Sequence, residues 1–205
     1  MSKAKGKPAS IEEVQGLIQS IKDTKEALNG DQRLAKAKFK AEIFINQLKD
    51  LNNAQRVDSI KQANDTDNLK DLSQIVSTAS DLNNSMSELK AKLKETVNPV
   101  KSSINYINAD YDLKRQFNKA VKDAREALSK TKSANLNERD IQGLSQAIDS
   151  TKDALNGEQR LAEAKEKSKQ FIKQLDTLNN AQNNYLTNEI NKSDNIKDIT
   201  NIVDN

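Results

Sequence analysis

The chain has 205 residues, of which 35% are hydrophobic, 31% are charged and 3% are aromatic, a composition that favours thin helical bundles over one wide globular core. Its 33 basic and 30 acidic residues nearly balance and are mixed within segments, so no basic stripe is available to bind a nucleic acid. No apolar run approaches the ~18 residues of a membrane span, and we expect no membrane insertion.

Two stretches of the chain are almost the same: LNGDQRLAKAK begins at Leu28 and LNGEQRLAEAK begins at Leu155. The match continues without a gap at this separation of 127 residues, so that LNNAQ at 51–55 also returns. The register extends outward as far as Ser2–Lys3, which corresponds to Ser129–Lys130. The chain therefore holds about one and two-thirds copies of a repeat, and we expect it to be an excerpt from a longer tandem array.

The first predicted helix begins at Ser10, where the pattern that runs to Glu13 is a capping box. Its apolar residues recur at the three-and-four spacing of one helix face, at Val14, Leu17, Ile18 and Ile21. Asn29–Gly30 is a turn or helix-stop signal, because glycine accepts the left-handed conformation that ends a helix. A continuous bent helix is the alternative, since the following LAKAK strongly favours helix. In the second copy the corresponding helix begins at Asn137 and reaches Asn156–Gly157.

A second helix carries an apolar stripe over 34–48, and a short third helix begins near Asn52–Asn53. After the polar stretch 64–67, a long stripe over 69–97 approaches a heptad repeat, the pattern of helices that pack at shallow angles. We expect that helix to end at Asn98–Pro99, because the residue before a proline is pushed out of helical geometry.

One more helix follows, with an apolar stripe over 113–128, before a loop at 129–136. Gly16 and Gly143 occupy equivalent mid-helix positions at a cost of ~1 kcal/mol relative to alanine, which predicts close approach of another helix there. Two three-helix groups per repeat account for these elements. The sequence therefore predicts an all-α protein, an extended rod of tandem three-helix bundles, and we expect it to be monomeric.

The second copy contains residues that resemble the GA module, a small three-helix bundle of Gram-positive surface proteins: Leu161–Lys165, Phe171–Ile172, Leu178–Gln182 and 190–203. The preceding segment is similar to the FIVAR module at Asn105–Tyr106, Ala109–Asp110, Phe117, Ala120–Val121 and Gln142–Leu144. Their alternation resembles giant staphylococcal matrix-binding surface proteins. The resemblance implies four units: 1–29 is the C-terminal part of a preceding FIVAR module, 30–79 is a GA module, 80–156 is a FIVAR module and 157–205 is a GA module truncated at its C-terminus.

The resemblance implies a repeat fragment of a bacterial cell-surface adhesin, extracellular and cell-wall associated, which binds host extracellular matrix through multivalent helical modules. Host fibronectin is the characteristic ligand of the family. Weak serum albumin binding by the GA modules is an alternative that the resemblance implies. Albumin-binding GA modules generally present aromatic residues on the second helix. The first copy departs from that pattern with Val57–Asp58, and only the second copy, with Asn184–Tyr185, has an aromatic residue there. The other alternative is a structural stalk or spacer with no ligand site, since bundles placed end to end gain reach quickly.

Nothing in the sequence indicates catalysis. Cysteine and histidine are both absent, and the five glycines are scattered singly, so the usual nucleophile, general base, zinc ligands and phosphate loop are missing together. We therefore expect no enzymatic activity, no cofactor and no metal site.

The aromatic residues divide into two groups. Three phenylalanines lie on apolar stripes and are expected in the core: Phe44, Phe117 and Phe171. The tyrosines are better candidates for ligand contact, because a tyrosine can keep its ring on an apolar surface and its hydroxyl in water: Tyr106, Tyr111 and Tyr185. Specific ligand-binding residues stay unassigned.

The two copies disagree at one place, where every residue of 56–63 differs from its partner in 183–190. Where the second copy has two large aliphatic residues on this helix, the first has Ser59 and Ala63. We predict that the helix in the first copy is either rotated to bring Ile60 inward or less tightly packed. Either way, its bundle should be the weaker one, by ~1–3 kcal/mol.

Overall fold

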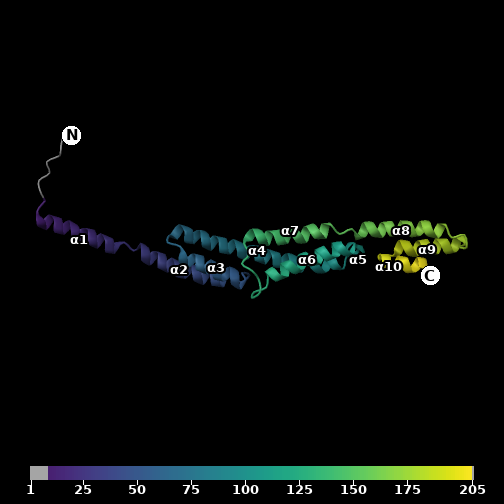
Figure 1. The fold of residues 1–205 in the computed structure, drawn as a ribbon, viewed down its shortest axis with the longest axis horizontal. Helices are drawn as coiled ribbons and strands as arrows, with labels where there is room; N and C mark the ends of the chain where they lie inside the picture. The colour runs from purple at the N-terminus through teal and green to yellow at the C-terminus, as the bar shows by residue number, and fades with distance from the viewer. Residues whose placement is uncertain (1–8, 205) are drawn as a thin grey trace, which may run out of the picture.

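The computed structural model describes residues 9–204 as helices joined by short connections, and none of those residues lies in a strand. Figure 1 shows the helices arranged along one axis in an elongated rod. The all-α class and the extended rod of tandem bundles are therefore confirmed. The expected repeat match at Ser2–Lys3 lies outside the described residues. The helices are α1 (Ile11–Ala27), α2 (Gly30–Gln47), α3 (Asn53–Asp65), α4 (Leu69–Lys101), α5 (Ile104–Asn108), α6 (Tyr111–Ala127), α7 (Glu138–Asp153), α8 (Gly157–Lys173), α9 (Asn180–Lys192) and α10 (Ile196–Asp204).

Local hydrogen bonds fix several helix starts. The Ser10 hydroxyl accepts from the Glu13 amide at 3.1 Å, and the Glu13 carboxylate accepts from the Ser10 amide at 2.8 Å. Asn137 and Asp140 form the same reciprocal pair at the start of α7. Both capping boxes were predicted, and each satisfies two amides that would otherwise lack a partner in the first helical turn.

The chain is not one continuous helix at either Asn-Gly pair. Helix α1 ends at Ala27 and α2 begins at Gly30, while α7 ends at Asp153 and α8 begins at Gly157. Neither glycine has a positive φ, so the expected left-handed stop is wrong. Each glycine is instead the first residue of the next helix, and the residues just before it leave helical geometry.

Two small bundles lie at different places along the rod. The first packs α2 and α3 against the N-terminal half of α4, and the last packs α8, α9 and α10 together. Their cores use equivalent positions, so Ile45 of the first corresponds to Ile172 of the last, and both are buried. The repeated sequence therefore builds the same bundle twice.

Helix α3 is not rotated relative to α9. Ala63 and Ile190 stand at equivalent positions and both are fully buried, while Ile60 is only half-buried against the core. The rotation that we considered is therefore wrong. The lower stability of the first bundle stays a prediction.

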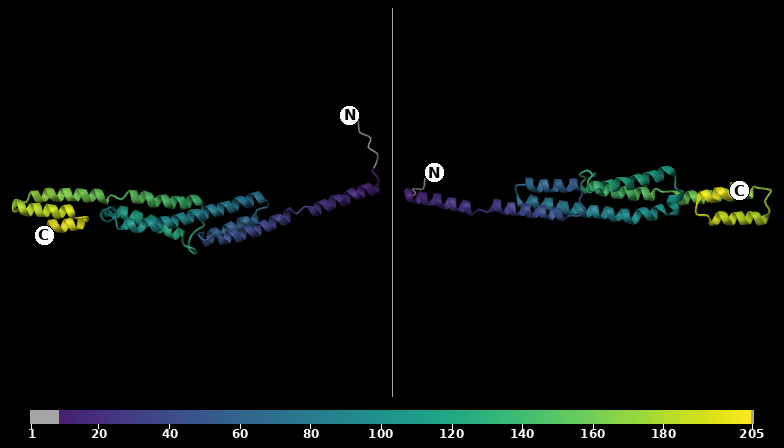
Figure 2. Two further views of the ribbon diagram at one scale, coloured as in Figure 1. Left: turned by 180° about the vertical axis from the view of Figure 1, so that it is seen from behind. Right: turned by 90° about the horizontal axis from the view of Figure 1, so that it is seen from below.

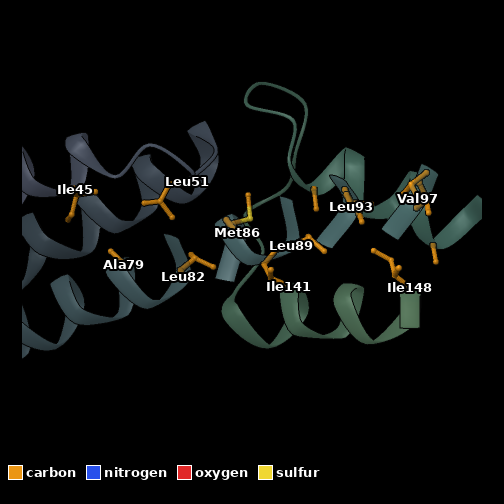
Figure 3. Close-up of a cluster of buried hydrophobic side chains, with 14 of the residues drawn as sticks. Ile45, Leu51, Ala79, Leu82, Met86, Leu89, Leu93, Val97, Ile141 and Ile148 are labelled. Carbon is orange, nitrogen blue, oxygen red and sulfur yellow. The ribbon is translucent and has the colours of Figure 1, made fainter. Parts of the chain in front are cut away.

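A third bundle in the middle of the rod packs the C-terminal half of α4 against α6 and α7. Figure 3 shows Met86 and Leu89 of α4 near Ile141 of α7, with Ile148 further along the same helix. Because α4 belongs to two bundles, the buried side chains of both bundles, from Ala41 to Ile148, form one continuous cluster. The connection between these two bundles is therefore a helix and not a loop.

Helix α4 does not end at its proline. Pro99 lies inside the last turn, and the helix continues to Lys101. A proline so close to a helix end removes only one backbone hydrogen bond, and the Ser102 amide bonds to the Asn98 carbonyl at 3.1 Å beyond it. The five-residue α5 that follows was not predicted, because one turn is too short to show a period.

Helix α1 extends from the rod by itself (Figure 2) and buries none of its residues. Its exposed apolar residues Leu17 and Ile21 correspond in the repeat to Leu144 and Ile148, which pack in the middle bundle. Its sequence therefore encodes a core-facing side without a partner among the described residues. A Cβ at Gly16, or at its counterpart in α7, would meet no atom within 4 Å, so the predicted close helix approach is wrong.

Candidate ligand-binding surfaces

Helix α2 exposes two large apolar side chains on its solvent face. Phe39 is 65% exposed and Ile43 is 44% exposed. Residues four apart on a helix are neighbours, so these two form one ridge, which we call the α2 patch. The equivalent residues of α8 are Glu166 and Gln170. Folding of the bundle therefore does not require apolar residues there, and an exposed apolar ridge is a feature of interaction sites.

A groove of about 340 Å³ lies between α2 and the start of α4. It is lined by Ala37, Lys40, Ala41, Phe44, Leu69, Leu72, Ser73 and Val76. Phe44 was expected in the core, as was Phe171 in the second copy, but both rings are exposed. A bundle of only three helices cannot cover the full width of each apolar stripe.

The remaining aromatic residues have different roles. Phe117 is fully buried, as predicted, and Tyr106 packs edge-to-face on it with 5.9 Å between ring centroids. The Tyr106 hydroxyl accepts a hydrogen bond from the Asn118 amide at 2.8 Å, so this tyrosine is structural. Tyr111 and Tyr185 are exposed and stay candidates for ligand contact.

A second groove, of about 710 Å³, lies beside α6. Four cationic side chains and one carboxylate line it: Lys101, Lys122, Arg125, Lys132 and Glu126. The Glu126 carboxylate is 3.6 Å from the Lys122 ammonium and leaves the other three cations without a carboxylate in the lining. This groove therefore favours an acidic group over a basic one.

The loop between α6 and α7 lies on the turn between α2 and α3, and we call this contact the junction. The Asn53 amide donates to the Lys130 carbonyl at 3.0 Å. The Asn52 side-chain amide donates to the Ser133 hydroxyl at 2.7 Å, and the Gln55 side-chain amide donates to the Leu136 carbonyl at 2.8 Å. Asn52 and Gln55 are only 0% and 1% exposed. The loop thus satisfies polar groups that it buries, as a stable contact requires.

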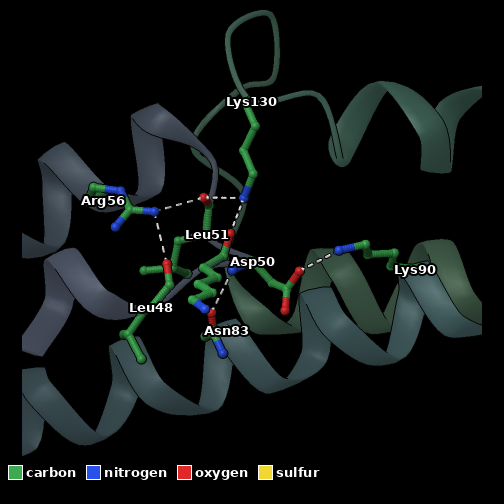
Figure 4. A network of polar contacts seen from close by, with 8 residues as sticks. Leu48, Asp50, Leu51, Arg56, Asn83, Lys90 and Lys130 are labelled. Atoms are coloured by element: carbon green, nitrogen blue, oxygen red, sulfur yellow. Dashed lines mark hydrogen bonds and ion pairs between the residues drawn. The ribbon is translucent and has the colours of Figure 1, made fainter.

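Charged groups complete the junction, as Figure 4 shows. The Lys130 ammonium donates to the carbonyls of Lys49 and Leu51, and its burial lowers its pKa. Arg56 donates to four carbonyls at the end of α2 and in the following turn, including Leu48 at 2.8 Å. These two cations therefore hold the carbonyls that the end of α2 leaves free.

Asp50 ties the same turn to α4. Its amide donates to the Asn83 side chain at 2.9 Å, and its carboxylate accepts from the Lys90 ammonium at 2.9 Å. The hydrogen bond and the positive charge of Lys90 hold the pKa of the Asp50 carboxyl below its ordinary value. The turn is thus fixed to both of its neighbours, α4 and the loop.

The short α5 forms a corresponding contact with the last bundle. Asn108 donates to the Asp194 carbonyl at 2.9 Å and accepts from the Ile196 amide at 2.8 Å. The Asp110 carboxylate accepts from the Asn156 side chain at 2.6 Å and pairs with Arg160. Sequence periodicity could not reveal these contacts, because the partners are 46 to 88 residues apart.

Among residues 9–204, no three carboxylates cluster closely enough to hold a metal ion. None of the helices in that range combines the length and the apolar character that crossing a membrane would require.

The helices form two small bundles at different places along the rod and a third bundle between them. Two family models match the sequence of the chain. The GA module matches residues 31–85 and 158–205, and the FIVAR domain matches residues 85–156. The chain belongs to the family of GA-module proteins, with a FIVAR domain between its two GA modules. Helix α4 runs without interruption from the first GA module into the FIVAR domain, so no break in the chain marks a boundary near residue 80. The bounds 30–79, 80–156 and 157–205 stay a prediction.

The chain is homologous to staphylococcal extracellular matrix-binding proteins. It is 36% identical over all 205 residues to EbhA of Staphylococcus aureus strain Mu3, of which it spans 3%, and 36% identical to Ebh of strain MW2, of which it spans 2%. The crystal structure of an EbhA domain (756–1003) from S. aureus superposes with a TM-score of 0.86 and 27% identity, covering 95% of this chain and 79% of that one.

A further solved structure comes from work on Embp-mediated adherence of Staphylococcus epidermidis to fibronectin. It superposes with a TM-score of 0.55 and 26% identity, covering 61% of this chain and 98% of that one. These relatives are named for binding extracellular matrix and for adherence to fibronectin.

Proposed function

We propose that the chain is a repeat fragment of a bacterial cell-surface adhesin, extracellular and cell-wall associated, whose modules bind host fibronectin. The similarity to proteins named for matrix binding supports the proposal over the whole chain, and so does the relative studied for adherence to fibronectin. In this proposal α1 is the last helix of a preceding FIVAR module, followed by GA, FIVAR and GA modules at 30–79, 80–156 and 157–205.

The observation that carries the proposal is the α2 patch. Phe39 and Ile43 are exposed and take no part in the core. The groove between α2 and α4 is lined by Phe44 of the same helix and does not include these two residues. Exposed apolar side chains provide the anchor that a protein partner can bury. We therefore assign the patch to fibronectin contact.

The second copy supplies a matched test, because it shows which residues the fold accepts at these positions. The double substitution Phe39→Glu and Ile43→Gln gives α2 the residues of α8 at these two positions. We expect the variant to keep its helical circular dichroism and to lose at least about tenfold in capture by immobilised fibronectin, the loss typical of removing an anchor. The reverse exchange, Glu166→Phe with Gln170→Ile, should increase capture.

Two outcomes would contradict this assignment. The first is equal capture of the parent chain and the Phe39→Glu, Ile43→Gln variant. The second is loss of capture on Lys122→Ala, in the cationic groove, while the α2 variant still binds, because the contact would then be ionic.

Repetition should matter more than the strength of one site. Linked modules convert later binding events into intramolecular ones, so arrays of this repeat should hold a fibronectin-coated surface far more tightly than one module. Equal retention of one module and of an array on such a surface would count against the proposal.

A stalk is the second candidate function, and the shared helix α4 favours it. A helix that runs through two bundles gives a stiff connection, which suits a spacer. If the Phe39→Glu, Ile43→Gln exchange changes nothing and the parent chain does not bind fibronectin, the stalk function is supported.

Weak albumin binding rests on Tyr185 alone. The substitution Tyr185→Asp, which introduces the residue of the first copy, should abolish any albumin binding that the parent chain shows.

A further inference from the structure

The turn between α8 and α9 repeats the junction residues of the first GA module but stays uncovered. Asn179 and Gln182 form the same capping box as Asn52 and Gln55. In the first module the two side chains are fully buried under the α6–α7 loop. In the second module both are exposed, and Leu178 is half-buried where its counterpart is fully buried.

The groups that hold the loop in the first module are all present in the second. The Asn53 amide, which bonds to the Lys130 carbonyl, corresponds to the amide of Asn180. The side-chain amides of Asn52 and Gln55, which bond to the loop at 2.7 and 2.8 Å, correspond to identical side chains. Since both turns begin with the same capping geometry, the donors of the second module are already positioned.

The charges that differ favour a cationic loop at the second module. Lys49 is replaced by Asp176, which exchanges a positive charge for a negative one beside the carbonyls that Lys130 binds. Arg56, which also donates to the Leu51 carbonyl that Lys130 binds, is replaced by the neutral Asn183. Asp50 is replaced by Thr177, so the number of carboxylates among these positions is unchanged. A lysine approaching this turn therefore meets two fewer cations and the same number of carboxylates as in the first module.

We propose that the surface at Leu178–Gln182 is the docking site for the α6–α7 loop of a further FIVAR module, a segment with the chemistry of Ser129–Leu136 and a lysine at the position of Lys130. The proposal is independent of fibronectin binding, because the α2 patch is not part of the junction. Its occupant is defined by the contact that the chain already makes once.

The direct test extends the intact chain after Asn205 with a copy of residues 79–156, which keeps the repeat register because Asn205 corresponds to Thr78. Amide hydrogen exchange is followed by NMR in the chain with and without the extension. We expect the Asn180 amide to exchange about tenfold more slowly or better when the extension is present. Replacing the added counterpart of Lys130 with Met should reverse part of that protection, as Lys130→Met should at Asn53.

A second measurement does not require the added module to fold. A synthetic peptide with the sequence of residues 128–137 is titrated into the unextended chain. We expect shifts in the side-chain amide signals of Asn179 and Gln182 and none at Asn52 and Gln55, whose site is already occupied by the chain itself.

Either of two results overturns the proposal. One is unchanged Asn180 exchange in the extended chain together with no peptide-induced shift at Asn179 or Gln182. The other is concentration-dependent protection of Asn180 in the unextended chain, because the surface would then be occupied by a second copy.

Discussion

Gly157 and Gly30 are equivalent in the repeat but differ in their surroundings, which makes alanine substitution at the two a sensitive comparison. Gly157 is buried against α5, and a Cβ there would lie 2.7 Å from the Ala109 nitrogen and closer still to the Asn105 carbonyl oxygen. Gly30 is exposed, and its Cβ would meet nothing within 4 Å. The same substitution therefore adds a backbone clash at one site and none at the other.

The sizes of the two effects follow from these contacts. Alanine in place of glycine favours a helix by up to ~1 kcal/mol, so Gly30→Ala should stabilise the chain by a few tenths of a kcal/mol to ~1 kcal/mol. At Gly157 the obstacle is backbone, which cannot rotate aside as a side chain can. Overpacking of that kind costs ~1–3 kcal/mol, so Gly157→Ala should destabilise the chain in spite of its helix propensity.

Thermal unfolding followed by circular dichroism measures both variants against the parent chain, and hydrogen exchange in α5 locates the damage. We expect Gly157→Ala to lower the unfolding temperature and to expose the Asn108 and Ala109 amides, because α5 must move away from α8. The reasoning would be refuted if Gly157→Ala were as stable as Gly30→Ala with α5 still protected, since α5 would then not be packed as described.

Three further predictions concern the first and second modules. Ile190→Ala, which gives α9 the residue of α3 at a fully buried position, should cost ~2–4 kcal/mol in urea unfolding, whereas Tyr185→Asp should change stability by less than ~0.5 kcal/mol; equal effects would contradict the common register of the two helices. Arg56→Asn, the residue found in the second module, removes four hydrogen bonds to carbonyls and should destabilise by ~1–3 kcal/mol; a neutral result in urea unfolding would show that water replaces the guanidinium. Because the folded-state pKa of Asp50 is depressed, the stability that its carboxylate contributes is complete above the unfolded pKa of ~3.9 and is lost as the pH falls through the folded pKa. The Asp50→Asn variant should therefore lose less stability than the parent chain between about pH 5 and pH 2. Parallel plots of unfolding free energy against pH for the two proteins would contradict the Lys90 contact.

Helix starts and repeats could be predicted from the sequence because they depend on neighbouring residues. The capping boxes at Ser10 and Asn137 need only a partner three residues away, and a 127-residue register shows in the sequence without knowledge of the fold. The exposure of Phe44 could not be predicted in this way, because an apolar stripe shows which side of a helix faces the core but not how many neighbours cover it.

The junction was missed for a different reason. Asn52 and Gln55 look like ordinary capping residues, and they are, but the same side chains also bind a loop about 80 residues away. No local pattern separates a capping residue that is exposed from one that is covered. The difference between Gln55 and Gln182, which are identical in sequence and opposite in burial, lies entirely in the presence of the neighbouring module.

The shared helix α4 also determines how the rod responds to being pulled. Tension along the chain passes from the first bundle to the middle one through its 33 residues, while the α2–α3 and α6–α7 pairs lie alongside. As a helix α4 spans ~50 Å at 1.5 Å per residue, and as an extended strand it would span ~110 Å. Unwinding this one element would more than double its length and would dismantle two bundles together, because each loses a wall of its core. A rod of this kind would lengthen under tension by cooperative unfolding steps, and each step would unfold a pair of modules together.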